Sequence, residues 1–420
     1  MKVVVFSLGC KVNQYEGRSL ISKLNADGHN AVEELEWADL YIINTCSVTS
    51  EADKKSRQAV ARVLKLNPNA KIIICGCSSQ NDVKQYKNKP NIVLIGGTSD
   101  KMELINSTMS DIMRQNSPQI VVKEPPKEYE DDLIGEVTKT RGYLKVQDGC
   151  DNFCSYCIIP YLRGRSRSRS LQSIQNEAEE MAKQTNELVI TGINVSDYGK
   201  NIGASLIDLV GILGKINVRK RFGSLECNVI NEQLLCEMQR ANFCDSFHLS
   251  LQSGSDNVLK KMNRKYTAQQ FIEKVKLIKK FFPNAGITTD IIVGFPTENE
   301  DDFNETLSLC EKVEFSQIHS FVYSARQGTI ASKLKPLDGN VLDERAKRLK
   351  AVAVELRNKF IKTQEGKECT IYPEDESDGY MVGYTSNYLK VYIPNGNYNK
   401  EVQCRILTKY RDGVKGEIIV

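Results

Sequence analysis

Three cysteines stand close together in the middle of the chain, at Cys150, Cys154 and Cys157. They cannot pair off as disulfides without one being left over, but all three thiolates can reach one face of an iron–sulfur cube. Because three ligands leave one iron of the cube open, that iron can bind a substrate. Zinc is the alternative, but structural zinc sites usually close with four ligands, and no fourth Cys or His lies nearby. The spacing therefore predicts a catalytic cluster.

Three further cysteines, Cys10, Cys46 and Cys77, follow strand-like runs in the N-terminal part of the chain. The runs are 2–7, 39–44 and 71–75. Since the carboxyl ends of parallel strands meet at one edge of a sheet, the three thiols are expected to lie together there. They either hold a second cluster or are unrelated core residues, and spacing alone leaves both possibilities open. Cys75 lies inside a strand and is expected to be a packed small hydrophobe.

The elements that must position these cysteines predict a mixed α/β chain with three domains. Strands alternate with helices in residues 1–120, which predicts a doubly wound parallel sheet, and residues 121–138 are expected to be a linker. Six strand–helix units, one with its strand at 222–229, and a trailing helix occupy residues 139–362. Six units are too few for a closed eight-stranded barrel and predict an open, partial (β/α)6 barrel. Five short strands in residues 363–420 predict a small antiparallel β-barrel.

The cysteine motifs resemble those of a known family. Cys-x3-Cys-x2-Cys with Tyr156 before the last cysteine resembles the signature of radical S-adenosylmethionine (SAM) enzymes, in which SAM occupies the open iron. The segments Leu8–Glu16, Asn44–Thr49 and Gly76–Gln80 resemble the three cysteine motifs of the methylthiotransferases within that superfamily. The resemblance implies a second cluster on Cys10, Cys46 and Cys77, and hence two 4Fe-4S clusters together with SAM. It also implies that the C-terminal barrel is a TRAM-type RNA-binding domain.

Polar and glycine-containing loops follow several strands of the predicted barrel, on the same side as the Cys150 loop. Glycine lets the backbone approach a ligand closely, and amide and hydroxyl groups can hold the ribose and carboxylate of SAM. Ordinary turns are the alternative. The candidate cofactor-binding residues are Tyr156, Thr191, Gly192, Asn194, Gln252, Ser253, Gly254 and Gly294.

Two features favour contact with RNA. The first is a run of alternating arginines after the cluster loop, made of Arg163, Arg165, Arg167 and Arg169. Guanidinium groups spaced in this way can follow a phosphate backbone or hold the SAM carboxylate, although a solvated basic loop is the alternative. The second is that seven of the 17 tyrosines fall between Tyr372 and Tyr410, where exposed rings can stack on bases and buried ones merely pack.

Composition restricts the protein class. A chain of 420 residues with 40% hydrophobic and 26% charged residues is typical of a globular protein with several domains. No apolar run reaches the ~20 residues of a membrane span, and the N-terminus does not have the pattern of a signal peptide. Thirteen cysteines without an export signal favour the reducing cytoplasm. A net charge of only +4 makes no case for nucleic acid by itself.

The resemblance implies a radical SAM methylthiotransferase, and the segment 10–14 is most similar to the enzymes that act on N6-threonylcarbamoyladenosine beside the tRNA anticodon. An aromatic C–H bond is neither acidic nor electrophilic enough for acid–base chemistry, so carbon 2 of the adenine needs a one-electron route supplied by cofactors. The alternatives are isopentenyladenosine in tRNA, an aspartate of a ribosomal protein, or a zinc-bearing RNA-binding protein without enzymatic activity. An electron donor and a sulfur donor are also implied, but the sequence does not identify them.

Overall fold

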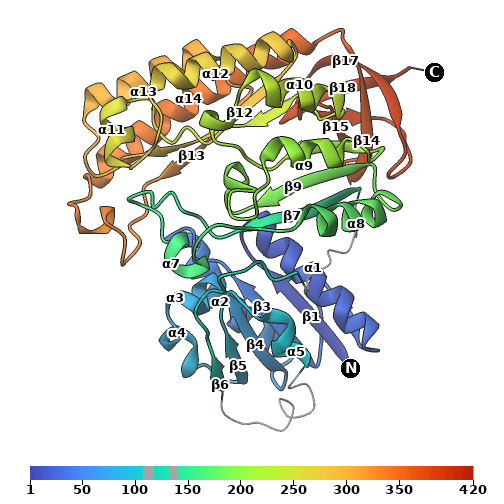
Figure 1. Cartoon of the computed structure of the whole chain (residues 1–420), viewed down its shortest axis with the longest axis vertical. Helices are drawn as coiled ribbons and strands as arrows, with labels where there is room; N and C mark the ends of the chain where they lie inside the picture. The colour runs from blue at the N-terminus through green and yellow to red at the C-terminus, as the bar shows by residue number, and fades with distance from the viewer. Residues whose placement is uncertain (107–117, 132–139, 420) are drawn as a thin grey trace.

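The computed structural model describes residues 1–106, 118–131 and 140–419 and has a mixed α/β fold, as the sequence predicts (Figure 1). The N-terminal part contains a six-stranded sheet in the order β2-β1-β3-β4-β5-β6, in which every pairing is parallel. Its strands are β1 (Lys2–Ser7), β2 (Asn30–Val32), β3 (Leu40–Thr45), β4 (Lys71–Gly76), β5 (Ile92–Gly96) and β6 (Gln119–Val121).

Helices cover both faces of this sheet, which makes it doubly wound. Helix α1 (Lys11–Ala26) and helix α5 (Lys101–Asn106) pack on one face, through residues such as Leu20 and Leu104. Helix α2 (Ser50–Leu66) packs on the other face, with Val60 and Val63 turned inward. The short helices α3 (Cys77–Asn81) and α4 (Lys84–Lys87) follow β4.

The expected linker, residues 121–138, is only partly described, since 132–139 lie outside the described residues. Its first residue, Val121, belongs to β6 and extends the parallel sheet. Further along, the Tyr129 hydroxyl donates to the Lys145 carbonyl at 3.1 Å, and Asp131 pairs with Arg169. Lys123 and Glu130 bond to Gln80 and Asp100 of the N-terminal domain, so the described part of this segment is held by both domains.

The central domain is an open barrel of six parallel strands. These are β7 (Arg141–Asp148), β9 (Glu187–Gly192), β10 (Arg219–Phe222), β11 (Ser246–His248), β12 (Gly286–Val293) and β13 (Gln317–Val322). The edge strand β8 (Arg167–Ser168) pairs antiparallel with β7. Isolated parallel bridges, such as that between Leu225 and Leu249, join the β10 side of the barrel to the β11 side. The outer helices are α8 (Leu171–Ala182), α9 (Leu206–Leu213), α10 (Glu232–Arg240), α11 (Asp256–Lys261), α12 (Ala268–Phe281), α13 (Glu300–Val313) and α14 (Gly339–Gln364).

The strand expected at 222–229 is wrong in its position. Strand β10 ends at Phe222, and Cys227–Val229 form a 3-10 turn, although Cys227 is still buried. The residues that do form the strand are mainly charged, and they are buried because Arg219 and Arg221 both pair with Glu187 at 2.7 Å.

Five strands form a closed C-terminal barrel in the order β14-β15-β16-β18-β17. They are β14 (Glu368–Ser377), β15 (Tyr380–Tyr384), β16 (Lys390–Ile393), β17 (Val402–Tyr410) and β18 (Gly413–Ile418). All pairings are antiparallel except that of β16 with β18, which is parallel. Ile361 of α14 packs into its core, so the long helix connects the two barrels.

Candidate active site

The cysteines of the first trio lie at the carboxyl ends of neighbouring strands. Cys10 follows β1 and caps the N-terminus of α1, Cys46 follows β3, and Cys77 is the first residue of α3 after β4. Burial, together with Cys77 and Cys10, raises the pKa of Cys46 to about 12. The three thiols therefore lie close enough to influence one another. Cys75, as expected, packs in the core under α1.

Polar side chains hold the three cysteine loops together. The Asn13 amide donates to the carbonyls of Leu8 at 2.9 Å and Thr45 at 2.8 Å, and so connects the Cys10 loop to the Cys46 loop. The Thr45 hydroxyl accepts the Ser78 N–H at 3.2 Å, next to Cys77. Gly9 adopts φ +90°, and a Cβ there would lie 2.3 Å from the Cys46 sulfur. Only glycine fits this close approach without displacing the cysteine.

The second trio lies in the loop after β7. Cys150, Cys154 and Cys157 line a pocket of about 150 Å³. Burial, together with the neighbouring cysteines, raises the pKa of Cys150 and of Cys157 to about 12. Backbone hydrogen bonds fix the ends of the loop: the Cys150 N–H donates to Gly164 and the Ser155 N–H donates to Met262.

The two trios face each other across helix α7 (Ile159–Arg163), which Figure 1 shows at the junction of the N-terminal sheet and the open barrel. Ile159 packs in one apolar cluster with Cys77 of the first trio and Cys157 of the second. Ile159 also lines both the pocket of the second trio and a cavity of about 820 Å³ into which Cys10 and Cys77 open. Cys10 and Cys77 of the first trio and the three cysteines of the second therefore border adjacent cavities.

The donor chemistry of the two sites fits iron–sulfur clusters. Each trio presents three thiols, and thiolates are the usual ligands of such clusters. The raised pKa values describe the thiols alone, because bound iron reverses this effect and stabilises thiolates. In the described ranges, no three His, Cys, Asp or Glu side chains are arranged to share a single metal ion.

Arg264 is a residue of this site that the sequence did not indicate. Its guanidinium lies 3.4 Å from the Cys154 sulfur, 3.0 Å from the Ser250 carbonyl and 2.9 Å from the Glu226 carboxylate. The Asn152 amide donates to the same carboxylate at 2.9 Å. A buried cation beside the second trio stabilises negative charge on its thiolates. Arg264 is 110 residues from Cys154 along the chain, so no local sequence pattern connects it with the trio.

Five of the eight predicted cofactor-binding residues line the cavities beside the cysteines, and three do not. Those that line the cavities are Tyr156, Thr191, Gly192, Asn194 and Gln252. The other three, Ser253, Gly254 and Gly294, are not among the residues that line these cavities. Ser253 is buried with its hydroxyl 3.3 Å from that of Thr306, and a Cβ at Gly254 would lie 2.6 Å from the Thr306 Cα. Gly294 has φ +76° and packs against Leu342. These residues serve helix packing and turn geometry.

The expectation that four arginines form a phosphate-binding row does not fit the structure. Arg163, Arg167 and Arg169 are buried, and each is held by a carboxylate, whereas Arg165 is exposed. A guanidinium that already neutralises a buried acid is not free to follow a phosphate backbone. Arg165 alone keeps its side chain in solvent, where it stacks on Phe153 at 4.6 Å.

Arg163 instead connects the two domains beside the first trio. Its guanidinium donates to Glu16 of α1 at 2.8 Å and to Asp148 of β7 at 3.1 Å. Burial alone would raise the pKa of Glu16, but Arg163, Lys101 and Lys145 hold it well below its ordinary value. Arg163 also opposes the rise that burial causes in the pKa of Cys10. A buried ionic network thus joins the N-terminal sheet, the barrel and the first trio.

The large cavity runs through the interior of the open barrel. Thr191 and Gly192 line it at the carboxyl end of β9, and Arg141 lines it at the start of β7. Tyr388, from the loop between β15 and β16, closes the amino end, where its hydroxyl accepts from Arg141 at 2.9 Å. Lys11 also lines the cavity, and burial, Arg141 and Arg221 lower its pKa to about 8.

The histidines of the barrel, to which the sequence assigned no role, also face this cavity. His248 and His319 both line it, with ring centroids 5.9 Å apart. His248 contacts the Thr288 hydroxyl at 2.9 Å and the Asp290 carboxylate at 3.2 Å. They come from different strands with no ligand-like spacing, so only the parallel packing of β11, β12 and β13 brings them together.

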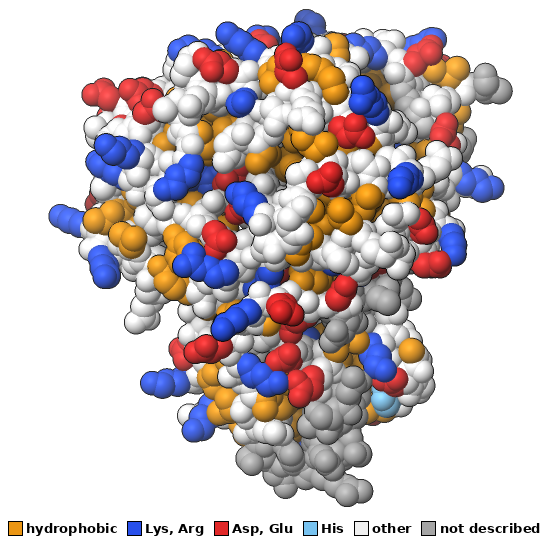
Figure 2. Space-filling view, in the orientation of Figure 1, with side chains coloured by type: hydrophobic (Ala, Val, Ile, Leu, Met, Phe, Trp, Pro, Cys, Tyr) orange, Lys and Arg blue, Asp and Glu red, His pale blue; other side chains and the backbone are white. Residues whose placement is uncertain are grey.

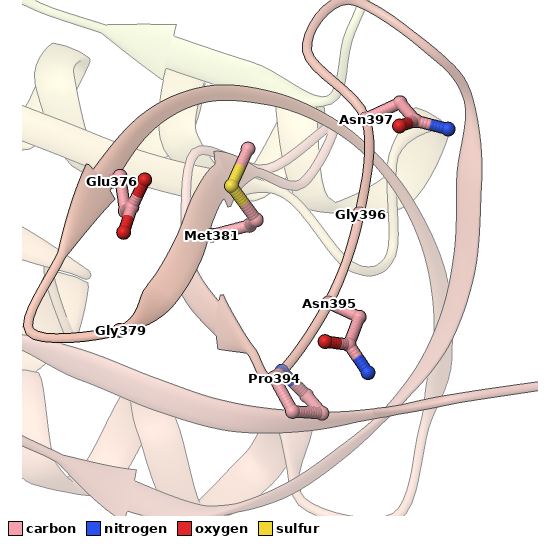
Figure 3. Close-up of a pocket in the computed structure, with 7 residues that line it drawn as sticks. All are labelled: Glu376, Gly379, Met381, Pro394, Asn395, Gly396 and Asn397. Atoms are coloured by element: carbon pink, nitrogen blue, oxygen red, sulfur yellow. The ribbon is translucent and has the colours of Figure 1, made fainter.

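A separate hollow of about 470 Å³ lies on the C-terminal barrel, between the β14–β15 turn and the segment from Pro394 to Asn397 (Figure 3). It is lined by Glu376, Met381 and small or polar residues, and it shares none of them with the cysteine cavities. It offers no constellation of chemical groups and is not a candidate active site. Among the described helices, none is long and apolar enough to cross a bilayer.

Comparisons with known proteins agree with this geometry. Residues 144–310 match the Radical SAM superfamily, and residues 2–97 match Uncharacterized protein family UPF0004. A threonylcarbamoyladenosine tRNA methylthiotransferase MtaB of Thermotoga maritima is 36% identical over 99% of this chain and 96% of its own length. The protein of that name from Bacillus subtilis is 34% identical over 93% of this chain and 90% of its own. A tRNA-2-methylthio-N(6)-dimethylallyladenosine synthase of Bacillus subtilis is 33% identical over 100% of this chain and 86% of its own.

Solved structures share the fold at low sequence identity. The radical SAM methyltransferase TsrM from Kitasatospora setae, with cobalamin and a [4Fe-4S] cluster bound, aligns with a TM-score of 0.58 at 12% identity, over 79% of this chain and 76% of that one. The cobalamin-dependent radical SAM enzyme OxsB aligns with a TM-score of 0.53 at 11% identity, over 84% of this chain and 56% of that one.

Proposed function

Because the chain belongs to the methylthiotransferase family of radical SAM enzymes, we propose that it adds a methylthio group to carbon 2 of N6-threonylcarbamoyladenosine beside the tRNA anticodon. The observation that carries this proposal is the arrangement of two cysteine trios beside adjacent cavities that share lining residues. A protein that only bound RNA would have no need of six thiols at one junction.

In this proposal the six cysteines hold the cofactors. Cys150, Cys154 and Cys157 would hold the cluster that binds SAM, in the pocket that Arg264 and Asn194 also line. Cys10, Cys46 and Cys77 would hold the auxiliary cluster. When bound, the two clusters and SAM supply the one-electron chemistry that replaces an aromatic C–H bond by C–S.

The protein's own residues contribute positioning and exclusion of water. Apolar residues such as Ile159, Ile193 and Phe321 line the cavities next to the thiols, which keeps the reacting region poor in water. The cavity of about 820 Å³ has room for a nucleoside turned out of its stack. Anticodon loops present such unstacked bases, which proteins bind individually.

The C-terminal barrel is the proposed RNA-docking domain. Tyr380 and Tyr392 each pack against Tyr410, with ring centroids 5.4 and 5.1 Å away, and the Lys415 ammonium lies 4.8 Å from the Tyr410 ring. Aromatic rings beside cations are the usual platform for single-stranded RNA. On the face seen in Figure 2, basic and acidic side chains are intermixed, so this proposal relies on stacking more than on a broad basic surface.

Two partners follow from the chemistry. A reductant must supply one electron for each SAM cleaved, and a sulfur donor must replace the sulfur that leaves with the product. With tRNA as the substrate, we propose that the protein acts in the cytoplasm.

The test is anaerobic purification followed by reaction with tRNA that carries N6-threonylcarbamoyladenosine. The protein should contain iron and sulfide and, with SAM and dithionite, should form the 2-methylthio nucleoside detectable by mass spectrometry. The Cys150→Ala variant should form none. A colourless protein with zinc, or product on isopentenyladenosine tRNA alone, would contradict the proposal. An unchanged methylthio-nucleoside profile in a strain without the gene would instead favour the ribosomal-protein substrate.

A further inference from the structure

The large cavity carries an excess of positive charge. Lys11, Arg141, Arg163 and Arg221 line it, and Asp290 is the only carboxylate among its lining residues in the described chain. The lining cations come from three different places: α1, the barrel strands and α7. A cavity with this lining favours an anionic ligand.

Most of these cations already have carboxylate partners outside the lining. Arg141 pairs with Glu374, and Arg221 pairs with Glu187 through contacts of 2.7 and 2.9 Å. Arg163 is held by Glu16 and Asp148. Lys11 is the exception, because its ammonium makes no ion pair or hydrogen bond with any described residue. A ligand that supplies a carboxylate would satisfy it.

Lys11 is also well placed relative to the proposed chemistry. It is the first residue of α1, directly after Cys10, so one end of the residue borders the first trio. Its aliphatic stem passes Gly223, where a Cβ would lie 3.7 Å from the Lys11 Cδ, and Gly223 also lines the cavity. The side chain thus extends from the cysteine edge along the barrel wall.

The side of the cavity formed by β11, β12 and β13 is mainly polar. Thr288 and Gln317, on β12 and β13, line it together with His248. A dimethylallyl group offers this side of the cavity no hydrogen-bonding group, whereas a threonylcarbamoyl group brings a carbonyl, an N–H, a hydroxyl and a carboxylate. Sites built to hydrogen-bond a polar substituent strongly reject analogues that lack it.

From these contacts we propose that Lys11 binds the carboxylate of the threonylcarbamoyl group and so selects this nucleoside over its dimethylallyl counterpart. The inference rests on the proposed function and adds to it the residue that reads the substituent. Arg141 and Arg221 support the site by making its end of the cavity positive while remaining bound to their own carboxylates.

The test uses anticodon stem-loop RNAs that carry N6-threonylcarbamoyladenosine, its methyl ester or plain adenosine. Binding to the cluster-loaded protein is measured by fluorescence anisotropy, and product is measured by mass spectrometry. The wild-type protein should bind the acid more tightly than the ester. Lys11→Met, which removes the charge but keeps the length, should weaken binding of the acid about 10- to 100-fold and leave the ester nearly unchanged. Lys11→Arg should retain the preference for the acid.

Lys65→Met is the matched control, because Lys65 is exposed on α2 and does not line the cavity. Iron content shows whether each variant is loaded, and the acid-to-ester ratio within one variant corrects for any partial loss of fold. Equal weakening of all three RNAs by Lys11→Met would assign Lys11 to the RNA backbone, and weaker SAM binding with an unchanged ratio would assign it to SAM. Either outcome overturns the inference. A wild-type protein that prefers the acid through Lys11 yet forms no methylthio product would refute the proposed function and leave the carboxylate site standing.

Discussion

Replacement of Arg163 by methionine should destabilise the protein far more than the same change two residues away. The Arg163 side chain is 1% exposed and bonds to Glu16, Asp148 and Asn13. Removing one partner of a buried ion pair costs about 3–5 kcal/mol, because it leaves charge behind without compensation. Here Glu16 keeps Lys101 and Lys145, so the expected loss is at the lower end, about 3 kcal/mol.

Arg165→Met is the matched control. Arg165 is 75% exposed and pairs with Asp151 at the surface, where such pairs contribute about 0–1 kcal/mol. Both variants are unfolded in urea under anaerobic conditions, with circular dichroism as the signal and iron content measured beforehand. Arg163→Met should shift the midpoint strongly and make the junction between the two domains sensitive to protease. If the two variants shifted the midpoint equally, the buried network would not hold the domains together.

Three further outcomes follow from individual residues. Cys77→Ala should lose the iron of one cluster and keep that of the other, whereas Cys75→Ala, two residues away in the core, should keep both; equal iron in the two variants would contradict the ligand assignment. Gly9→Ala should lose the same iron as Cys77→Ala and lower the free energy of unfolding by more than about 1 kcal/mol, because the new Cβ would lie 2.3 Å from the Cys46 sulfur and the backbone there is left-handed. Calorimetry and iron analysis test this. Glu187 has its pKa lowered to about 2, because Arg221, Arg219 and Arg141 together outweigh the effect of burial. The stabilising effect of Glu187 is therefore complete above its ordinary pKa of 4.5 and is lost as the pH falls toward 2. Glu187→Gln should flatten the dependence of the free energy of unfolding on pH in this range, and an unchanged slope there would refute this explanation.

The sequence was informative wherever parallel strands decide the placement. Cys10, Cys46 and Cys77 are far apart in the chain, but each directly follows a β-branched run, and adjacent parallel strands bring such positions to one edge. The Cys150 loop was predictable for the same reason. The closed C-terminal barrel was recognisable from short alternating strands, although the parallel pairing of β16 with β18 leaves no mark in the pattern.

Charged residues were the main source of error. The strand predicted at 222–229 lies instead at Arg219–Phe222, where the charged residues are accommodated because Glu187 neutralises the arginines and Lys220 donates to the carbonyls of Leu213 and Ile216. The arginines from 163 to 169 read as an exposed basic loop, yet three of the four are buried with acids from distant segments. Arg264 gave no signal for the same reason. Partners of this kind lie far away in sequence, and no local period reveals them.

The position of Tyr388 gives the C-terminal barrel a second role. The Tyr388 ring stacks on the Tyr384 ring and lies under the guanidinium of Arg221. It lines the amino end of the large cavity, which Cys10 and Cys77 also line. A chain truncated after α14 would therefore lose Tyr388 from the cavity as well as the domain proposed to dock RNA. The amino end of the cavity would then be open to water. Arg141 and Arg221 would lose their contacts with the Tyr388 side chain. In this architecture the domain proposed to dock RNA also closes the amino end of the cavity.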